Sequence, residues 1–471
     1  MKTMQVFNTL THKKEDFAPL VPGKVGIYAC GPTVYNYIHI GNARPLIVFD
    51  VLRRFLIHLG YDVKYVQNFT DIDDKMIRRA REENTTVDAV AEHYIGEYWT
   101  DAGALHVEKA DVHPRATKHI GEIIALIKKL EAKGLAYPAG EGDVYFDTQA
   151  YRKNYGKLIG QDLDDLESGA RIEVDEIKRH PMDFALWKGQ KPGEPAWKSP
   201  WGMGRPGWHI ECSAMSMKYL GETFDLHCGG VDLVFPHHEN EIAQSEGATG
   251  KPFARYWMHN GFINIDNKKM SKSAGNFFTV RDVLGEFDPE AVRLFMLSAQ
   301  YRSPVNFSRE LVEQAKNSLE RLYNARDNAA FAREHAPERE MTDAEKVFVA
   351  RGHQAVEAFD AAMCDDLNTA DALAAIFEYV RDMNTALAAA NEPCAAVIDQ
   401  SLESLKTMTD VLGLLWKEAD ATPEDVKALV EARTAAKKAK NFAEADRIRD
   451  EIAQKGYVVE DTPKGPKVKK T

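Results

Sequence analysis

Side chains that could bind a transition metal occur at three separate places in the sequence. Cys30 ends an apolar run, Cys212 ends the segment Trp-His-Ile-Glu-Cys, and His237 precedes Glu241 by four residues. Residues i and i+4 share one face of a helix, so this pair and the two thiolates could complete a four-ligand zinc site. His238 with Glu241 is the competing pair. Taken singly, the cysteines are also explained as small buried hydrophobic residues and the His/Glu cluster as a polar helix face.

A second kind of chemistry, phosphate binding, is indicated by two short segments. Residues 39–42, His-Ile-Gly-Asn, are expected in a loop before a helix, where N–H groups face phosphate and Gly41 permits close approach. Far downstream, Lys269, Ser271 and Lys272 combine charges and hydroxyls that can neutralise a triphosphate as pyrophosphate leaves. Alone, each segment is weak, because a single His is more often structural and a Lys/Ser loop is usually a solvated turn.

Strand and helix patterns alternate around these segments. Residues 25–30 form an apolar run that predicts a strand, and residues 43–59 carry apolar side chains at helical spacing. Residues 62–69 predict a second strand, which an acidic turn and another helix follow. Such alternation is typical of parallel sheets, so we expect the α/β class and a Rossmann-like domain.

An insertion is expected to interrupt this sheet. Between residues 112 and 206 the pattern is mixed, with short strands such as residues 144–148 and a stretch rich in Pro, Gly and Trp. The sheet is expected to resume with a strand at 223–229, a helix at 237–245 and an extended run at 257–265. The sequence thus predicts one nucleotide-binding fold that carries a peripheral module.

The second half of the chain is expected to be helical. Strand signals nearly vanish after residue 289, and Leu311, Ala315, Leu319 and Leu322 recur at the spacing of one helix face. Breaks are predicted near residues 336–337, 392–393 and 421–423, where Pro and polar residues interrupt the pattern. The predicted domains are residues 1–111 with 207–288 (catalytic), 112–206 (inserted connective module), 289–421 (helical stem and bundle) and 422–471 (small C-terminal unit).

Composition restricts the classes of function. The 471 residues carry 60 Lys and Arg against 72 Asp and Glu, which argues against wholesale electrostatic wrapping of nucleic acid and leaves local basic patches for any RNA contact. No apolar run reaches the roughly 18 residues of a membrane span, so a cytoplasmic location is expected. The 5 cysteines are odd in number and irregularly spaced, so reduced thiols or metal ligands are expected instead of a disulfide framework.

One basic segment near the C-terminus could contact RNA. Residues 433–449 interleave Lys437, Arg449 and other cations with Phe442, combining phosphate neutralisation with a possible stacking surface. Asp446 could read a base edge. The alternative is a solvated amphipathic helix with one core Phe.

The two phosphate segments, in this order and setting, resemble the paired HIGH and KMSKS motifs of the class I aminoacyl-tRNA synthetases. Asn42 stands where the family has its second His, so it keeps hydrogen-bonding capacity but cannot carry a proton charge. The resemblance implies ATP binding, with His39, Lys269 and Lys272 stabilising phosphate charge, Gly41, Asn42 and Ser271 beside them, and Mg²⁺ accompanying the nucleotide.

The position of Cys30 nine residues before His39, with the other candidate ligands between the two motifs, resembles the cysteinyl branch of this family. That resemblance implies one Zn²⁺ per chain, held by Cys30, Cys212, His237 and Glu241, with Glu241 as the weak ligand. A substrate thiolate is a far better zinc ligand than a hydroxyl, so the metal can separate cysteine from serine. Expected substrate contacts are Thr70, Trp208, His227 and Asp232, although a helix cap, a core aromatic side chain and a turn-stabilising Asp explain Thr70, Trp208 and Asp232 about equally well. Cys228 is another possible ligand, which the resemblance places in the pocket wall, while Cys364 and Cys394 are expected to be structural.

The implied reaction joins L-cysteine to ATP, releases pyrophosphate and transfers the cysteinyl group to tRNA(Cys). The basic C-terminal unit, including Lys437, Phe442, Asp446 and Arg449, would then bind the anticodon. One alternative function is that of a cysteine ligase that acts on an amino sugar without tRNA, which the basic C-terminal unit disfavours. A second alternative is an inactive RNA-binding relative, which the lysine residues of the phosphate segment and the metal-binding residues disfavour.

Overall fold

The structure, a computed structural model, describes residues 3–163, 166, 178–265, 268–269, 278–389, 393–418, 422–462 and 465–470. The chain forms two compact units. The first comprises Met1–Leu319, Phe359–Leu373 and Val411–Gly413, and the second comprises Glu320–Ala358, Ala374–Asp410 and Leu414–Thr471.

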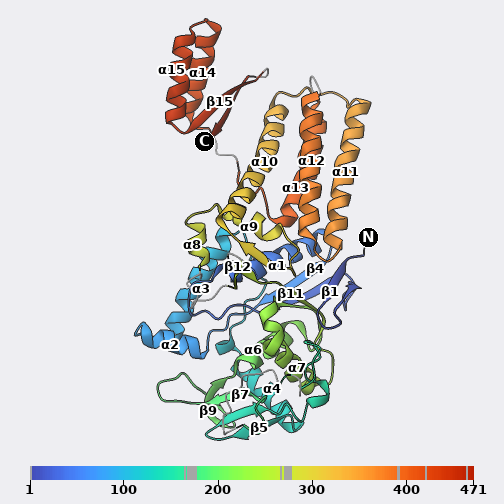
Figure 1. Cartoon of the computed structure of the whole chain (residues 1–471), viewed down its shortest axis with the longest axis vertical. Helices are drawn as coiled ribbons and strands as arrows, with labels where there is room; N and C mark the ends of the chain where they lie inside the picture. The colour runs from blue at the N-terminus through green and yellow to red at the C-terminus, as the bar shows by residue number, and fades with distance from the viewer. Residues whose placement is uncertain are drawn as a thin grey trace. The chain divides into compact units, whose positions relative to one another are not determined.

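A four-stranded parallel sheet lies at the centre of the first unit. Its strands are β3 (Lys24–Ala29), β4 (Asp62–Gln67), β10 (Phe224–Gly230) and β11 (Ala254–Asn260), in the order β11-β10-β3-β4. Every residue of β10 except its last is buried, which is typical of a strand covered on both faces. Helix α1 (Ile40–His58) packs against β4, β10 and β11, while α6 (Trp208–Leu220) packs against β3 and β4 (Figure 1).

The strand order creates a crevice at the carboxyl ends of β3 and β10. From β3 the chain continues to β4 on one side, whereas from β10 it continues to β11 on the other side. Ligands of open α/β sheets bind where the connections diverge in this way. The strand order therefore points to the space beyond Ala29 and Gly230 as the binding region.

The insertion folds onto two helices of the sheet region. It contains helix α4 (Ile120–Ala132) and an antiparallel sheet in the order β5-β6-β7-β9-β8. The strands are β5 (Ala136–Ala139), β6 (Asp143–Phe146), β7 (Phe184–Gly189), β8 (Trp197–Ser199) and β9 (Gly202–Pro206). Its apolar core includes Trp187 of β7 together with Ile210 of α6 and Ala243 of α7 (Glu239–Thr249). The insertion therefore supports the helices that carry candidate metal ligands.

The other elements of the first unit surround the sheet. They are the hairpin β1 (Gln5–Asn8) and β2 (Lys13–Asp16), helices α2 (Asp74–Glu82), α3 (Val87–Ala104), α8 (Val280–Leu284) and α9 (Pro289–Leu297), and the small sheet β13-β12-β14 with strands β12 (Ile263–Ile265), β13 (Lys268–Lys269) and β14 (Val305–Phe307).

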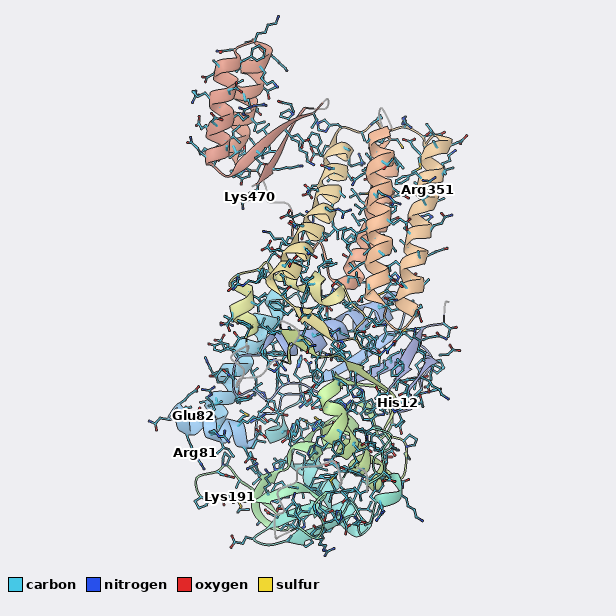
Figure 2. The ribbon with its side chains drawn as sticks, in the orientation of Figure 1. His12, Arg81, Glu82, Lys191, Arg351 and Lys470 are labelled. Carbon is cyan, nitrogen blue, oxygen red and sulfur yellow. The ribbon has the colours of Figure 1, made fainter. Side chains whose placement is uncertain are left out.

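Four long helices, α10 (Arg309–Glu334), α11 (Asp343–Cys364), α12 (Thr369–Ala389) and α13 (Ala395–Leu412), run largely through the second unit. Side-chain contacts join α12 to each of the other three, so the helices lie side by side (Figure 1). Arg351 of α11 is exposed to solvent (Figure 2).

The end of the second unit has a core of its own. Helices α14 (Glu424–Lys438) and α15 (Phe442–Gln454) pack with the hairpin of β15 (Tyr457–Thr462) and β16 (Gly465–Lys470). The buried apolar residues are Val426, Val430, Ile448, Ile452, Tyr457 and Val459. Lys470 ends β16 (Figure 2).

The α/β class is confirmed, and the helices of the second half break close to all three predicted places. The prediction that strands are nearly absent after residue 289 was wrong, because β14 and the hairpin β15–β16 lie there. The extended run at 257–265 divides into β11 and β12 at Gly261, where an added Cβ would lie 2.5 Å from the Arg302 carbonyl oxygen. Only glycine fits this close backbone approach.

Candidate active site

A cavity of about 470 Å³ opens at the crevice between β3 and β10. Its lining includes Cys30, Thr70, Trp208, Cys212, Asp232 and His237 on one part, and His39, Gly41, Asn42, Gly261 and Ile263 on another. Three of the four candidate metal ligands, Cys30, Cys212 and His237, therefore share one cavity with the first phosphate segment, while Glu241 is not among its lining residues.

The phosphate segment forms the start of α1. His39 is the N-cap residue, its backbone N–H donates to the Asn42 side-chain oxygen at 3.1 Å, and the helix begins at Ile40. The prediction that residues 39–42 form a loop was therefore wrong for its last three residues, because this capping arrangement extends the helix toward the strand. Gly41 and Asn42 lie in the first turn, where the helix dipole gives the cavity a positive end. In this turn the Ile40 N–H donates to the Phe278 carbonyl and the Asn42 N–H to the His39 carbonyl.

The two candidate thiol ligands meet although they lie far apart in the sequence. Cys30 follows the end of β3, Cys212 lies in the first half of α6, and their sulfur atoms are 3.6 Å apart. Two thiolates on one tetrahedral zinc, each about 2.3 Å from the metal, would be about 3.8 Å apart. The observed separation thus suits a shared zinc ion.

A histidine and a carboxylate complete this group. The Nε2 atom of His237 lies 3.1 Å from Oε1 of Glu241, and the same oxygen lies 3.5 Å from the Cys30 sulfur. Ligand atoms of Cys30, Cys212, His237 and Glu241 all lie within 4.8 Å of one another. The donor set, with two thiolates, one imidazole and one carboxylate, fits zinc.

The predicted helix at 237–245 begins later than expected. Helix α7 starts at Glu239, and the turn Val234–His238 before it contains Phe235 in an extended conformation. Pro236 lacks a backbone N–H, so a regular helix cannot run through this turn. His237 nevertheless remains within reach of Glu241 because the turn leads directly into the helix.

Electrostatics favours an ionised carboxylate in this group. Burial opposes ionisation of Glu241, but His227 and His237 outweigh burial and lower the Glu241 pKa to about 2. Burial also disfavours the charged form of His237, whereas Glu241 and Cys212 raise the His237 pKa to about 10. Glu241 and His237 therefore each favour the charged form of the other.

A second set of ligand atoms overlaps the first. Cys30, His227, His238 and Glu241 also lie within 4.8 Å of one another. His227 Nε2 lies 2.8 Å from Glu241 Oε2, while His238 Nε2 lies 3.9 Å from Glu241 Oε1. Neither His227 nor His238 belongs to the described lining of the cavity.

Two histidines that were not predicted, His209 and His259, and the competing candidate His238 lie beside these ligands. His209 Nδ1 lies 3.0 Å from His237 Nδ1, and His238 Nδ1 lies 2.7 Å from His259 Nε2. Burial lowers the pKa of His209, His238 and His259, which favours their neutral forms. No periodic pattern joins them, because they come from separate strands and helices, so the sequence offered no signal for this network.

The predicted substrate contacts fall into two groups. Thr70, Trp208 and Asp232 line the cavity, and the Trp208 ring stacks on His237 with their centroids 4.2 Å apart. His227 is instead fully buried behind Glu241. Cys228, expected in the pocket wall, is also fully buried and is absent from the described lining.

The second phosphate segment is described only at its start. The backbone of Lys269 pairs with Asn264 in the sheet β13-β12-β14. Ser271 and Lys272 lie outside the described residues. On the far side of this segment, the Phe278 carbonyl accepts from the N–H of Ile40, which brings the chain back to the start of α1.

The predicted RNA residues lie on two helices and not on one. Lys437 lies one residue before the end of α14, and its side chain donates to Asp461 at 2.7 Å. Phe442 is the first residue of α15, and 60% of its surface is exposed. Asp446 and Arg449 form an ion pair at 3.4 Å.

No described helix has both the length and the apolar character needed to cross a membrane.

The class of protein follows from this fold and site together with family comparisons. Residues 16–317 match the model of the tRNA synthetases class I (C) catalytic domain, residues 358–416 match the DALR domain, and residues 419–467 match the Cysteinyl-tRNA ligase anticodon binding domain. The first match spans more than half of the chain. A nucleotide cavity at the divergence of a parallel sheet agrees with a class I tRNA synthetase domain.

Comparison with individual relatives shows which family of class I tRNA synthetases the chain belongs to. The chain is 56% identical to the cysteine–tRNA ligase of Symbiobacterium thermophilum over 466 residues, covering 98% of each chain. It is 54% identical to the cysteine–tRNA ligase of Caldicellulosiruptor saccharolyticus over 470 residues, covering 99% of this chain and 100% of the relative. The chain therefore belongs to the cysteine–tRNA ligase family, and the predicted family and activity class are confirmed.

Solved structures share the fold at low sequence identity. The Mycobacterium tuberculosis methionyl-tRNA synthetase in complex with methionyl-adenylate has a TM-score of 0.60 at 16% identity, covering 83% of this chain and 89% of that one. The LeuRS of Agrobacterium radiobacter, in a ternary complex with tRNA and LeuAMS, has a TM-score of 0.61 at 13% identity, covering 84% and 85%.

Proposed function

We propose that this cavity activates L-cysteine with ATP and that the chain transfers the cysteinyl group to tRNA(Cys). The observation that carries the proposal is the joint placement of the thiols of Cys30 and Cys212 with the N-terminus of α1 in one cavity. Activation requires a carboxylate to approach the α-phosphate in line, and a shared cavity supplies that proximity.

The metal set that we propose is Cys30, Cys212, His237 and Glu241. Cys30, Cys212 and His237 line the cavity, so a substrate sulfur entering it can approach their common centre, whereas His227 and His238 lie behind it. Zinc bound there would offer a site for the substrate thiolate, which it prefers over a hydroxyl. Glu241 has His227 as an alternative partner at 2.8 Å, which supports its role as the weak ligand.

The remaining substrate roles rest on position. Thr70 and Asp232 are proposed to bind the amino end of cysteine, and Trp208 is proposed to cover its side chain, since all three line the cavity. His227 is not among the lining residues and is proposed to hold Glu241 instead.

The nucleotide is proposed to bind across the start of α1. The first turn of α1 at Gly41, which lines the cavity, would bring the positive end of the helix dipole to its phosphates, with His39 beside them. Lys269, Ser271 and Lys272 are proposed to stabilise the charge that develops as pyrophosphate leaves, and Mg²⁺ would accompany the ATP.

The C-terminal unit is proposed to read the tRNA. Phe442 offers an exposed ring beside the cations of α14 and α15, a combination suited to stacking a base and neutralising phosphate. Lys437, Asp446 and Arg449 are proposed as neighbouring contacts.

Two further expectations stay predictions. They are the domain limits at residues 111, 206, 288 and 421 and the cytoplasmic location.

One set of assays tests the whole proposal. Purified protein should catalyse ATP–pyrophosphate exchange with cysteine and far less with serine, contain one zinc per chain, and charge purified tRNA(Cys). Chelation that removes the metal should abolish exchange with cysteine, and added zinc should restore it. Full activity in metal-free protein would overturn the metal assignment, whereas exchange without charging would overturn the tRNA assignment.

A further inference from the structure

Arg44 is a fully buried arginine in the second turn of α1, close behind the phosphate segment. Its Nη1 atom donates to the carbonyl oxygens of Gly261 at 2.9 Å and Phe262 at 3.0 Å, and its Nη2 atom donates to that of Gln300 at 3.2 Å. One side chain therefore joins α1 to two backbone segments that are more than 200 residues away in sequence.

Two of these carbonyl groups belong to the wall of the cavity. Asn260, Gly261, Phe262 and Ile263 line it beside the start of α1, and Ile263 begins β12. The Gly261 N–H also donates to the Tyr301 carbonyl at 2.8 Å, so this backbone is held from both sides. Because β12 pairs with β13, the position of Gly261 and Phe262 also sets the backbone of Lys269.

The charge of Arg44 is not explained by ion pairing. In the part of the chain that the structure describes, no Asp or Glu forms a salt bridge with it, and burial lowers its pKa to about 10. A buried cation held only by neutral acceptors costs stability compared with an apolar side chain of similar size. A buried arginine of this kind can still hold several backbone segments in place, because its planar guanidinium group donates to several carbonyl groups at fixed geometry.

We propose that Arg44 is a positioning residue for ATP, which holds the cavity wall at residues 260–263 against the start of α1. This inference rests on the proposed binding of ATP at α1. The wall and the helix start are the two sides of the nucleotide half of the cavity, so a change in their spacing alters ATP binding first. The metal group comprises Cys30 after β3, Cys212 on α6, His237 in the turn Val234–His238 and Glu241 on α7, and none of these segments accepts a hydrogen bond from Arg44.

The test compares Arg44→Lys with a matched control, Arg293→Lys. Arg293 is also fully buried and also donates to three carbonyl groups, those of Leu412, Leu105 and His106, but it lies away from the cavity lining and pairs with Asp50. Both substitutions keep the charge and remove the fork, so both should lower the melting temperature.

The readouts are the KM values for ATP and cysteine in pyrophosphate exchange, together with zinc content. Arg44→Lys should raise the KM for ATP at least fivefold while the KM for cysteine and the zinc content stay within twofold of wild type. Arg293→Lys should leave all three unchanged. An unaltered KM for ATP in Arg44→Lys, or an equal rise of both KM values, would overturn the inference.

A second variant distinguishes a loss of folding from a loss of ATP positioning. Arg44→Gln keeps two N–H donors without charge, and it should show the same selective rise in the KM for ATP. If neither Arg44 variant folds while Arg293→Lys does, Arg44 serves folding alone and the inference is wrong. Wild-type protein without cysteine-dependent exchange would instead refute the proposed function, whatever the variants do.

Discussion

At the scale of single residues, three cysteines near the central sheet, the half-buried Cys30 and the buried Cys212 and Cys228, differ in their chemistry. A hydrogen bond from Cys30 lowers the pKa of Cys212, whereas burial raises the pKa of Cys30 and of Cys228. The thiolate is the form that binds metal, so Cys212 is the most readily ionised ligand, while Cys228 stays a protonated, apolar side chain. Similar burial therefore does not imply a similar role.

Replacing Cys212 by alanine should remove the metal and the choice of substrate together. We expect Cys212→Ala to lose most of its zinc and to lower cysteine-dependent exchange by at least 100-fold, because one soft ligand of the group is missing. Elemental analysis and exchange with cysteine against serine measure the two effects.

Cys228→Ala is the matched control for this change. It removes a similarly buried sulfur atom from strand β10 and should keep zinc and exchange. If Cys212→Ala retains both its zinc and its selection against serine, the metal assignment is wrong.

Sequence reasoning reached part of this site. Cys30, Cys212, His237 and Glu241 were found because two of them have helical spacing and all resemble one family pattern. His209, His238 and His259 were not recognised as a supporting network, because only the sheet order and the turn before α7 bring them together. Long-range pairing of this kind leaves no local periodicity.

At the scale of elements, the helices of the second unit are joined by buried polar contacts at their ends. Glu345 accepts hydrogen bonds from the Arg339 guanidinium at 2.8 and 3.0 Å, from the Thr342 N–H at 2.8 Å and from the Cys394 N–H at 2.9 Å. The carboxylate thereby links the start of α11 to the residue before α13. Arg339 is the main cause of a Glu345 pKa well below its usual range.

Glu345→Gln should destabilise the second unit by about 1–3 kcal/mol at pH 7, the typical cost of losing charged hydrogen bonds of a largely buried group. Chemical denaturation followed by circular dichroism measures the change. Glu378→Gln is a control, since Glu378 is an exposed partner of Arg381 on α12 and should have no measurable effect.

The effect of Glu345 should depend on pH with a defined sign. Its pKa is lower in the folded than in the unfolded state, so its contribution is complete above the unfolded pKa of about 4.3 and disappears as the pH falls further. The stability difference between wild type and Glu345→Gln should therefore shrink below about pH 4. A difference that stays constant from pH 7 to pH 3 would contradict this account.

Element boundaries were less predictable than element types. The strand and helix alternation of the first unit followed from apolar periodicity, but α1 begins earlier than predicted because His39 and Asn42 cap it. The hairpin β15–β16 was missed because its strands are short and polar, with lysines along β16. Capping and hairpin pairing depend on contacts that hydrophobic patterns do not record.

At the scale of the whole molecule, the two steps of the proposed reaction are assigned to different units. The cavity lies in the first unit, while the exposed Phe442 and its neighbouring cations lie in the second. Activation of cysteine needs only the first unit, whereas transfer needs tRNA bound by both. A change in the second unit should therefore separate the two activities.

Phe442→Ala should raise the KM for tRNA(Cys) about 5- to 150-fold, which corresponds to the loss of about 1–3 kcal/mol from one stacked base. Pyrophosphate exchange should not change. Val458→Ala, which truncates another exposed apolar residue of the same unit, is the control. Equal KM values for Phe442→Ala and wild type would show that this ring does not contact the tRNA.

The pairing of β3 with β10 also has a consequence for biosynthesis. Cys30 leaves the ribosome 182 residues before Cys212, a delay on the order of 10 to 40 s at ordinary translation speeds. During this interval the first strands of the sheet have no neighbour on one edge, and the first thiol has no companion. The metal centre can therefore assemble only after about half of the chain has been made, when Glu241 follows Cys212.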